Sequence, residues 1–342
     1  MVEKYWLGMV LIFISGLFNG TFALPMKYSR HWKWENTWMV FSVVGILALP
    51  WVMAYTFVPH LTEVYRAVPG RILLLPLIFG FLWGFAQTTY GLSLNAVGLA
   101  MAVSIVSGLA VISGSLVPLL VLNPADILRS RGILLLCSLP ILILGLALYG
   151  VAGRLREKEQ QAAGSATPSG GHSFRAGLAL CIFTGVFGST FNLGYAFSGD
   201  IIKASLQSGA GPATAGSAVW SLVFGAGFLP NFFYCLYVLK RNRTFPVFAQ
   251  GRWAKDALLA VAMAVIWLSG LLLYGAGAIW AGKYGTSIGF TVFIATSILS
   301  SSAVGLLAGE WKLTSSRSKR LLAGGLAATL AAVVVLNLGG LF

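Results

Sequence analysis

Long apolar stretches alternate with short polar ones along nearly the whole chain. A helix needs about 20 apolar residues to cross the hydrocarbon core of a bilayer, and ten stretches reach or approach that length. No Asp, Glu, His, Lys or Arg falls inside any of them. The pattern predicts ten membrane-spanning helices, over residues 6–23, 38–58, 72–94, 97–122, 133–151, 176–197, 213–239, 257–278, 286–308 and 321–342.

The least apolar stretch divides the chain in two. Residues 153–174 read GRLREKEQQAAGSATPSGGHSF, with charged residues first and Gly, Ser, Thr and Pro afterwards. Such a segment buries too little apolar surface to offset the entropy of ordering it. We therefore expect a flexible hydrophilic linker between a first unit, residues 1–152, and a second unit, residues 175–342, each with five apolar stretches.

Two matched halves around a hydrophilic hinge are typical of transporters built from an internal repeat. Because five is odd, the second half must cross the membrane in the opposite orientation to the first. Phe18-Asn19 in the first stretch is matched by Phe191-Asn192 in the sixth. We predict an all-α membrane protein whose ten transmembrane helices form two inverted five-helix repeats.

Composition excludes a water-soluble globular protein. The 342 residues are 58% hydrophobic and 9% charged, with a mean hydropathy of +0.85, whereas soluble domains carry about 25% charged residues. The lipid bilayer is therefore the expected surrounding medium. The net charge of +14 is interpreted as a topology signal in short loops, and we expect no binding to nucleic acid.

The distribution of basic residues predicts an orientation. Sixteen of the 23 Lys and Arg residues follow the first, third, fifth, seventh and ninth stretches. Positively charged loops stay in the cytoplasm. The linker is thus expected to be cytoplasmic, and both termini are expected on the outer side.

No catalytic or metal-binding pattern stands out. The three histidines, His31, His60 and His172, lie in polar segments, and the three cysteines lie singly within apolar stretches. An enzyme working inside the membrane would show a buried acid, His or metal cluster. We expect no enzymatic activity, no metal and no cofactor.

Polar side chains in the middle of a membrane helix are costly, and they mark either ligand contacts or contacts between helices. Gln87 lies with Trp83 one turn before it and Tyr90 nearly one turn after it, on one helix face. An amide beside aromatic rings suits an uncharged, hydroxyl-rich ligand such as a sugar, and hydrogen bonding between helices is the alternative. The candidate substrate-binding residues are Asn19, Trp83, Gln87, Tyr90, Asn95, Asn192, Tyr195 and Tyr274.

Three segments carry a family resemblance. Residues 25–51, PMKYSRHWKWENTWMVFSVVGILALPW, contain the pattern W-x-W-E-x-x-W…P-W. The other two segments are WGFAQTTYGLSLNAVGLAMAV from Trp83 and Gly309-Glu310-Trp311 at the end of the ninth stretch. Together they resemble the rhamnose–proton symporter family, within the drug/metabolite transporter superfamily.

The resemblance implies ten helices in two inverted repeats and secondary, proton-coupled uptake of a neutral sugar. L-Rhamnose or a related deoxyhexose would be the substrate, and protons the coupling ion, in the bacterial inner membrane. Alternating access with a site near the midplane would be the mechanism. Members of the superfamily often have cytoplasmic termini, opposite to the orientation that the basic residues predict here.

Proton coupling needs a titratable group, and membrane relays use Asp, Glu or His. None lies inside the ten stretches, so a coupling carboxylate must stand at a helix end. Glu35 is the first candidate because Trp32, Trp34 and Trp38 could shield it from water. Asp200, which follows the stretch that carries Asn192, is the second.

Two other functions fit the same pattern of helices. One is export or facilitated passage of another small metabolite, such as an amino acid. The other, of a different class, is a membrane subunit that transports nothing. Reconstituted protein that moves labelled solute would separate the transporters from the subunit.

Overall fold

The structure is a computed structural model that describes residues 2–97, 99–162, 174–309, 311–312 and 314–338. Within these residues every regular element is helical. Ten helical segments of this described part are long and apolar enough to span a bilayer. The prediction of an all-α protein with ten membrane-spanning helices is therefore confirmed.

The first half contains five spans, most of them single helices. Its elements are α1 (Val2–Thr21), a 3-10 turn (Leu24–Tyr28), α2 (Trp34–Phe41), a π-helical stretch (Ser42–Ala48), α3 (Leu49–Phe57), α4 (Leu61–Ala67), α5 (Gly70–Val97), α6 (Leu99–Leu122), a 3-10 turn (Pro124–Asp126) and α7 (Ser130–Ala162). The second span is continuous from α2 to α3. Its π-helical stretch precedes Pro50, which has no backbone N–H and so disturbs the regular ladder.

The second half also contains five spans. Its elements are α8 (Phe174–Gly188), α9 (Thr190–Ala196), α10 (Gly199–Gln207), α11 (Ser217–Asn242), a 3-10 turn (Phe245–Ala249), α12 (Trp253–Trp280), a 3-10 turn (Gly282–Tyr284), α13 (Ile288–Leu307) and α14 (Ser316–Leu338). The stretch predicted as one helix over 176–197 is divided between α8 and α9. The break falls at Ser189, whose hydroxyl lies 2.8 Å from the Ser113 hydroxyl of α6.

The fifth span is longer than its apolar stretch. The pattern predicted a linker from residue 153 onward, but α7 continues through Ala162. The residues concerned include Glu, Lys, Arg, Gln and Ala, all of which are strong helix formers. The carboxylate of Glu159 also accepts hydrogen bonds from the Ser315 amide and the Ser318 hydroxyl at the start of α14. Residues 163–173 of the predicted linker lie outside the described residues.

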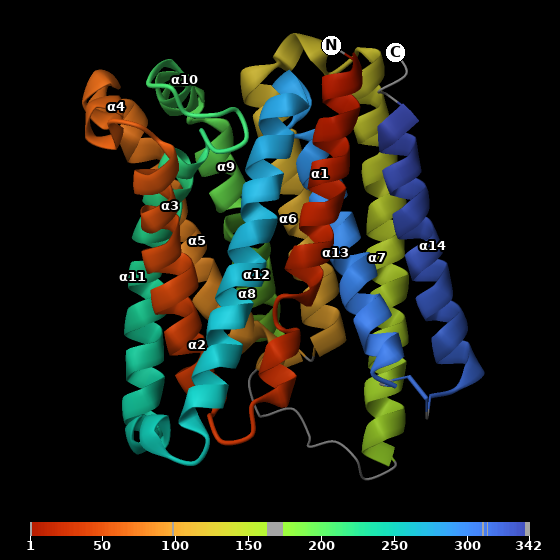
Figure 1. The fold of residues 1–342 in the computed structure, drawn as a ribbon. Helices are drawn as coiled ribbons and strands as arrows, with labels where there is room; N and C mark the ends of the chain where they lie inside the picture. Colours follow the sequence, from red (N-terminus) through yellow and green to blue (C-terminus); the bar gives the residue numbers. More distant parts are fainter. Residues whose placement is uncertain (1, 98, 163–173, 310, 313, 339–342) are drawn as a thin grey trace.

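Helices from the two halves are interleaved. α5 packs on α11, α1 packs on α12 and α13, α7 packs on α14, and α8 packs on α5 and α6. α1 begins and α14 ends at one end of the bundle, and α7 ends and α8 begins at the other (Figure 1). We call these the terminus end and the linker end. Which end faces the cytoplasm stays a prediction.

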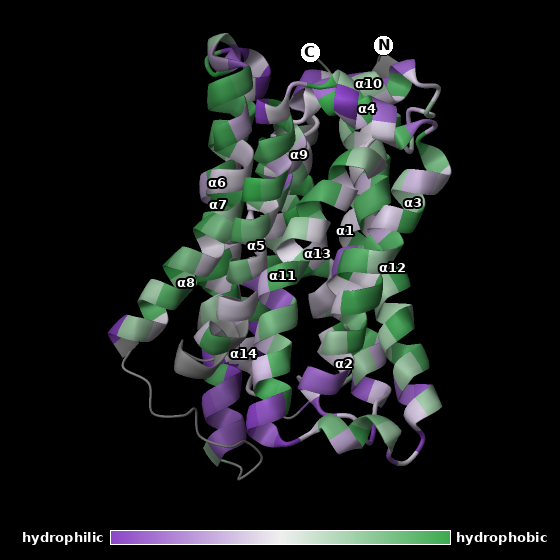
Figure 2. Ribbon diagram, turned by 90° about the vertical axis from the view of Figure 1, so that its left-hand side faces the viewer, coloured by the Kyte–Doolittle hydropathy of each residue, from purple (hydrophilic) through white to green (hydrophobic). Residues whose placement is uncertain are grey.

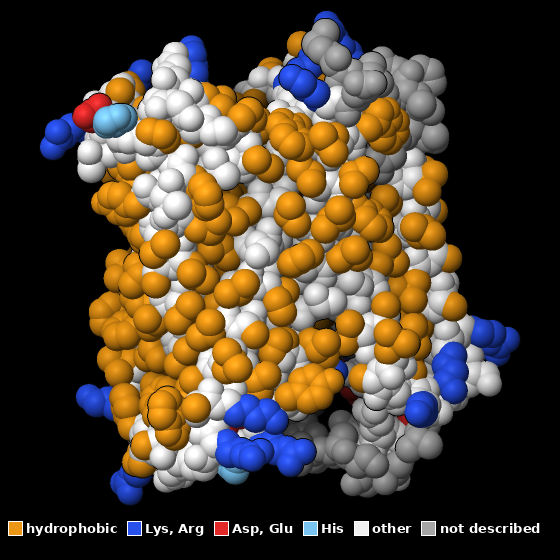
Figure 3. Space-filling model, viewed as in Figure 1, with side chains coloured by type: hydrophobic (Ala, Val, Ile, Leu, Met, Phe, Trp, Pro, Cys, Tyr) orange, Lys and Arg blue, Asp and Glu red, His pale blue; other side chains and the backbone are white. Residues whose placement is uncertain are grey.

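The surface has the polarity of a membrane protein. Hydrophilic residues gather at the two ends of the helices, and the middle is mostly hydrophobic (Figure 2). Figure 3 shows Lys and Arg side chains at the two ends and a broad hydrophobic belt between them. Lipid chains can cover this hydrophobic belt. Inside the bilayer, each helix pairs its own backbone N–H and C=O groups by hydrogen bonds within the helix.

Candidate functional site

A cavity of about 180 Å³ lies between six of the spans. α5, α6 and α8 with α9 form one side, and α1, α12 and α13 form the other. Its lining consists of Asn19, Trp83, Ala86, Gln87, Tyr90, Val106, Ser107, Ala110, Thr184, Gly188, Phe191, Trp267, Leu271, Phe293 and Ile294. A mostly apolar wall with a few polar groups is the usual composition of a small-molecule site.

Four of the predicted residues line this cavity: Asn19, Trp83, Gln87 and Tyr90. The last three come from one face of α5, as their spacing predicts. Among the described residues, neither the Gln87 amide nor the Tyr90 hydroxyl has a hydrogen-bond partner. Asn19 donates to the Ser297 hydroxyl of α13 at 3.1 Å, so its amide oxygen remains an acceptor. The cavity thus offers donors and acceptors without a charge.

Aromatic rings cover the apolar part of the wall. Trp83 and Trp267 are stacked, with ring centroids 6.0 Å apart and an angle of 17° between the planes. Phe191 packs edge-to-face against Trp83 at 6.2 Å. Flat rings beside a free amide can hold the apolar face of a sugar ring while the amide binds its hydroxyls.

The break between α8 and α9 lies at the cavity, where Gly188 is part of the lining. Thr190, the first residue of α9, donates to the Phe79 carbonyl of α5 at 2.8 Å and so anchors the new helix. Discontinuous helices at membrane depth are tolerated where they line a cavity, and they supply backbone polar groups to a ligand.

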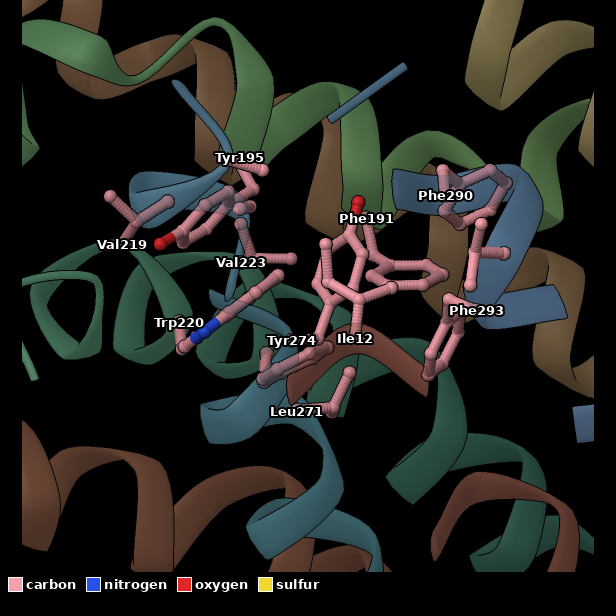
Figure 4. Close-up of a cluster of buried hydrophobic side chains, with 14 of the residues drawn as sticks. Ile12, Phe191, Tyr195, Val219, Trp220, Val223, Leu271, Tyr274, Phe290 and Phe293 are labelled. Atoms are coloured by element: carbon pink, nitrogen blue, oxygen red, sulfur yellow. The ribbon is translucent and has the colours of Figure 1, made fainter. Parts of the chain in front are cut away.

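A dense aromatic cluster, shown in Figure 4, packs against the cavity residue Phe191. Tyr195 and Trp220 are stacked at 4.3 Å, and Trp220 continues onto Phe224 at 5.2 Å. Tyr274 and Phe290 are fully buried beside them. Tyr195 and Tyr274 each lie about one turn nearer the terminus end than a cavity residue on the same helix. We call this set the aromatic plug.

Three other predicted residues make buried hydrogen bonds between helices and do not line the cavity. Asn192 is fully buried, and its amide donates to the carbonyls of Gly114 at 2.8 Å and Thr286 at 2.9 Å. Tyr274 donates its hydroxyl to the Asn192 side-chain oxygen. Tyr195 donates to the Gly275 carbonyl at 3.0 Å. These side chains bind helices together beside the cavity.

The two carboxylates predicted for proton coupling have different environments. Glu35 is 5% exposed in the first turn of α2. It accepts hydrogen bonds from Asn242 and Thr244, both at 2.9 Å, and no basic side chain of the described residues pairs with it. Asp200 is exposed in the first turn of α10 at the terminus end. The side chain of Asn95, the eighth predicted substrate residue, lies outside the described part.

Aromatic contacts connect the start of α2 with the cavity. Trp34 stacks on Trp38 at 5.4 Å, and Trp38 contacts Phe41 at 4.9 Å. Phe41 in turn packs edge-to-face on Trp267 at 5.6 Å, and Trp267 is part of the cavity wall. The start of α2, the helix that carries Glu35, is therefore joined to the cavity by contiguous packed aromatic side chains.

At the terminus end an ion pair links two loops. Lys283 donates to Asp126 at 2.6 Å, and Arg129 lies 3.3 Å from the other oxygen of that carboxylate. The hydrogen bond from Lys283 lowers the pKa of Asp126, and the same bond raises the pKa of Lys283. This pair fastens the segment after α6 to the segment after α12 above the aromatic plug.

Sequence reasoning missed several cavity residues. Trp267 and Phe293 lie within apolar stretches and give no polarity signal. Thr184 pairs with Thr89 of α5 at 2.8 Å, a contact between the third and sixth spans that spacing alone does not reveal. In the described part no three His, Cys, Asp or Glu residues gather where they could hold a metal ion.

Ten spans around an uncharged, aromatic-walled cavity define a multi-pass membrane protein with the form of a small-solute transporter. The family model described as L-rhamnose-proton symport protein (RhaT) matches residues 1–341. The chain belongs to this family of transporters, and it is a multi-pass protein of the bacterial inner membrane.

Named relatives match over nearly the whole chain. An L-rhamnose-proton symporter of Cronobacter sakazakii is 25% identical over 346 residues, covering 99% of each chain. Proteins with the same name from Mannheimia succiniciproducens and Klebsiella pneumoniae are 25% and 24% identical, over 97% and 93% of each chain. The resemblance noted in the Trp-rich motif therefore extends to the full length.

Proposed function

We propose that this protein takes up L-rhamnose, or a related deoxyhexose, together with protons, and that the sugar binds in the cavity beside Gln87. The observation that carries the proposal is that the Gln87 amide and the Tyr90 hydroxyl, which have no hydrogen-bond partner among the described residues, line one cavity with the stacked rings of Trp83 and Trp267. An uncharged wall of this kind favours a neutral polyol over an amino acid, whose two charges would need partners. The family supports the same substrate.

A binding screen tests the substrate. A ligand that binds only the folded protein raises its thermal stability by mass action, by about 2.7 kcal/mol at 100 times its dissociation constant. L-Rhamnose should raise the unfolding temperature of the purified protein, and a panel of amino acids should leave it unchanged. Stabilisation by an amino acid alone would instead support the alternative transporter.

We further propose that the fold consists of two inverted repeats. In two such repeats α1 corresponds to α8, α12 to α5, and α13 to α6. The packing of α1 on α12 and α13 should then have a counterpart in the packing of α8 on α5 and α6, and both sets of contacts occur. Exchanging the halves maps the α7–α14 and α6–α13 contacts onto themselves. α1 begins at the terminus end and α8 begins at the linker end (Figure 1), as opposite orientations of the halves require.

Alternating access is the mechanism that we propose for this arrangement. The aromatic plug and the Asp126–Lys283 pair seal the terminus end. At the other end, Gln87, Tyr90 and Asn19 are only partly buried, and Figure 3 shows the surface hollowed near the linker end. We infer that this conformation exposes the site toward the linker end, and that the opposite state opens the plug.

Glu35 is our candidate for proton coupling. It is a buried carboxylate whose side-chain hydrogen-bond donors in the described part of the chain, Asn242 and Thr244, are neutral, so protonation removes a buried charge without breaking an ion pair. The aromatic contacts from Trp34 to Trp267 give a physical route from its helix to the cavity.

Replacing Glu35 separates coupling from binding. The Glu35→Gln protein should exchange labelled rhamnose across a vesicle membrane but should not concentrate it in response to a pH gradient, because an amide releases no proton. Asp200→Gln, at an exposed position, serves as the control and should accumulate sugar normally. If Glu35→Gln still concentrates rhamnose, Glu35 is a structural residue.

A further inference from the structure

A second hollow lies on the membrane-facing side, away from the sugar cavity. It is a groove of about 430 Å³ between α6, α7 and α8. Both α7 and α8 pack on α6, so α6 forms the floor and the other two form the walls. The lining is almost wholly aliphatic, and Ile143 and Ile182 on the walls are 39% and 48% exposed. All three helices are membrane spans, so hydrocarbon surrounds the groove.

Basic side chains stand at the linker end of both walls. Arg154 lies about three turns beyond Ile143 on the same face of α7. Arg175 lies nearly one turn before Leu178 and two turns before Ile182 on one face of α8. Both arginines are exposed, and neither has an ion-pair partner within the described residues. The groove therefore has an apolar body and a positively charged end.

We propose that this groove binds an anionic phospholipid, with an acyl chain along α6 and its phosphate at Arg154 and Arg175. The position of the arginines along the helices fits the chemistry, because the groove is lined from within apolar stretches and Arg154 and Arg175 lie just beyond the linker ends of those stretches. Guanidinium groups bind phosphate oxygens with paired hydrogen bonds, and basic residues between membrane helices attract anionic headgroups. A zwitterionic lipid such as phosphatidylcholine also carries a phosphate, but its own ammonium group neutralises that charge, so the two arginines favour a headgroup with a net negative charge.

The groove and the sugar cavity share two walls. On α6, Ser107 faces the cavity and Gly108 faces the groove; on α8, Thr184 and Ile182 have the same relation. A bound lipid would thus support the helices that carry the cavity. The proposal does not depend on which solute the cavity holds.

Gly108 allows the groove to be filled without disturbing the bundle. A Cβ atom built there meets only the Leu146 Cδ1 atom, at 3.8 Å. The variant Gly108→Leu should therefore fold and occupy the space of the acyl chain. Gly324 on α14 is the matched control, since its Cβ would meet only Leu148 Cδ1 at 3.7 Å and it does not line the groove.

The test titrates fluorescent phosphatidylglycerol and phosphatidylcholine into the purified full chain in detergent. Phosphatidylglycerol should bind saturably and about 25-fold more tightly than phosphatidylcholine, because each arginine contributes about a factor of five. The double variant Arg154→Gln, Arg175→Gln should abolish this preference. Gly108→Leu should weaken binding of both lipids, and Gly324→Leu should bind them as the wild type does.

Three results would overturn the proposal. Equal binding of the two lipids by the wild type would show that the arginines do not form a headgroup site. Unchanged lipid binding by Gly108→Leu would show that the lipid does not bind in the groove. A dimer that forms an efficient disulfide through Ile182→Cys in lipid vesicles would assign the groove to a second copy of the chain.

Discussion

Two kinds of amide occur in the middle of this membrane protein, and their partners distinguish them. Asn192 has its donors and its acceptor occupied by Gly114, Thr286 and Tyr274, whereas Gln87 faces the cavity without a partner among the described residues. A buried polar group that is satisfied holds helices together. A polar group in the cavity wall without such a partner is available to bind a ligand.

Sequence alone could find both amides but could not separate these roles. The face shared by Trp83, Gln87 and Tyr90 follows from helix periodicity, and the structure brings all three to one cavity. The matching positions of Asn19 and Asn192 suggested a common role, yet only Asn19 lines the cavity. The difference depends on which carbonyls lie nearby, and spacing along one chain carries no such information.

Truncating Gln87 should weaken sugar binding and leave the fold intact. Gln87→Ala removes hydrogen bonds to the ligand that cost about 1–3 kcal/mol to lose, or about 5- to 150-fold in the dissociation constant. Calorimetric titration with L-rhamnose measures the change. Thr88→Ala is the control, because the Thr88 hydroxyl donates to the Phe85 carbonyl of its own helix and Thr88 does not line the cavity. Wild-type affinity in a folded Gln87→Ala protein would remove Gln87 from the site.

Replacing Tyr274 should lower the stability of the fold, in contrast to the effect of Gln87→Ala on sugar affinity. In Tyr274→Phe the buried side-chain oxygen of Asn192 loses its donor, which costs about 1–3 kcal/mol of stability. The unfolding temperature in detergent should fall. Tyr195→Phe should lower it less, since the Gly275 carbonyl that Tyr195 contacts also lies inside a helix, where it can accept a backbone bond. Equal unfolding temperatures for wild type and Tyr274→Phe would contradict the network.

At the level of elements, hydrophobicity located all ten spans but not their irregularities. Apolar runs indicate where a helix can be buried in lipid, and this set the number of spans. They carry no signal for the break at Ser189, which depends on contacts with Ser113 and the neighbouring α5. The charged continuation of α7 is helical because helix formers and the Glu159–Ser315 contact support it in the absence of apolar burial.

The loop contact at the terminus end should depend on pH. The folded pKa of Asp126 lies below its ordinary value of 3.8, so the ion pair stabilises the protein above that value and is lost as pH falls through the lowered pKa. Unfolding temperature should therefore drop between about pH 5 and pH 2. Asp126→Asn should remove part of this drop and should lower stability at neutral pH.

Other acidic groups titrate in the same range, so the difference between the two proteins is the informative quantity. Wild type and Asp126→Asn should converge at low pH and separate as pH rises. Parallel curves at a constant separation would show that the Asp126–Lys283 pair does not contribute in the way its geometry implies.

At the level of the whole molecule, the chain is a ten-span member of the L-rhamnose-proton symport family. The apolar pattern, the hydrophilic linker and the Trp-rich motif were sufficient to predict the class and the family. The cavity required the tertiary packing, because its wall combines side chains from both halves of the chain. The aromatic plug required it too, since its rings come from α9, α11, α12 and α13.

Sugar accumulation driven by a pH gradient tests the central claim most directly. Purified protein in vesicles that are alkaline inside should concentrate labelled L-rhamnose above its external level, and a protonophore should abolish the accumulation. Gln87→Ala should require a higher sugar concentration for the same rate. Rhamnose that only equilibrates, at a rate indifferent to the gradient, would show a facilitator, and vesicles that exclude rhamnose altogether would contradict the proposed function.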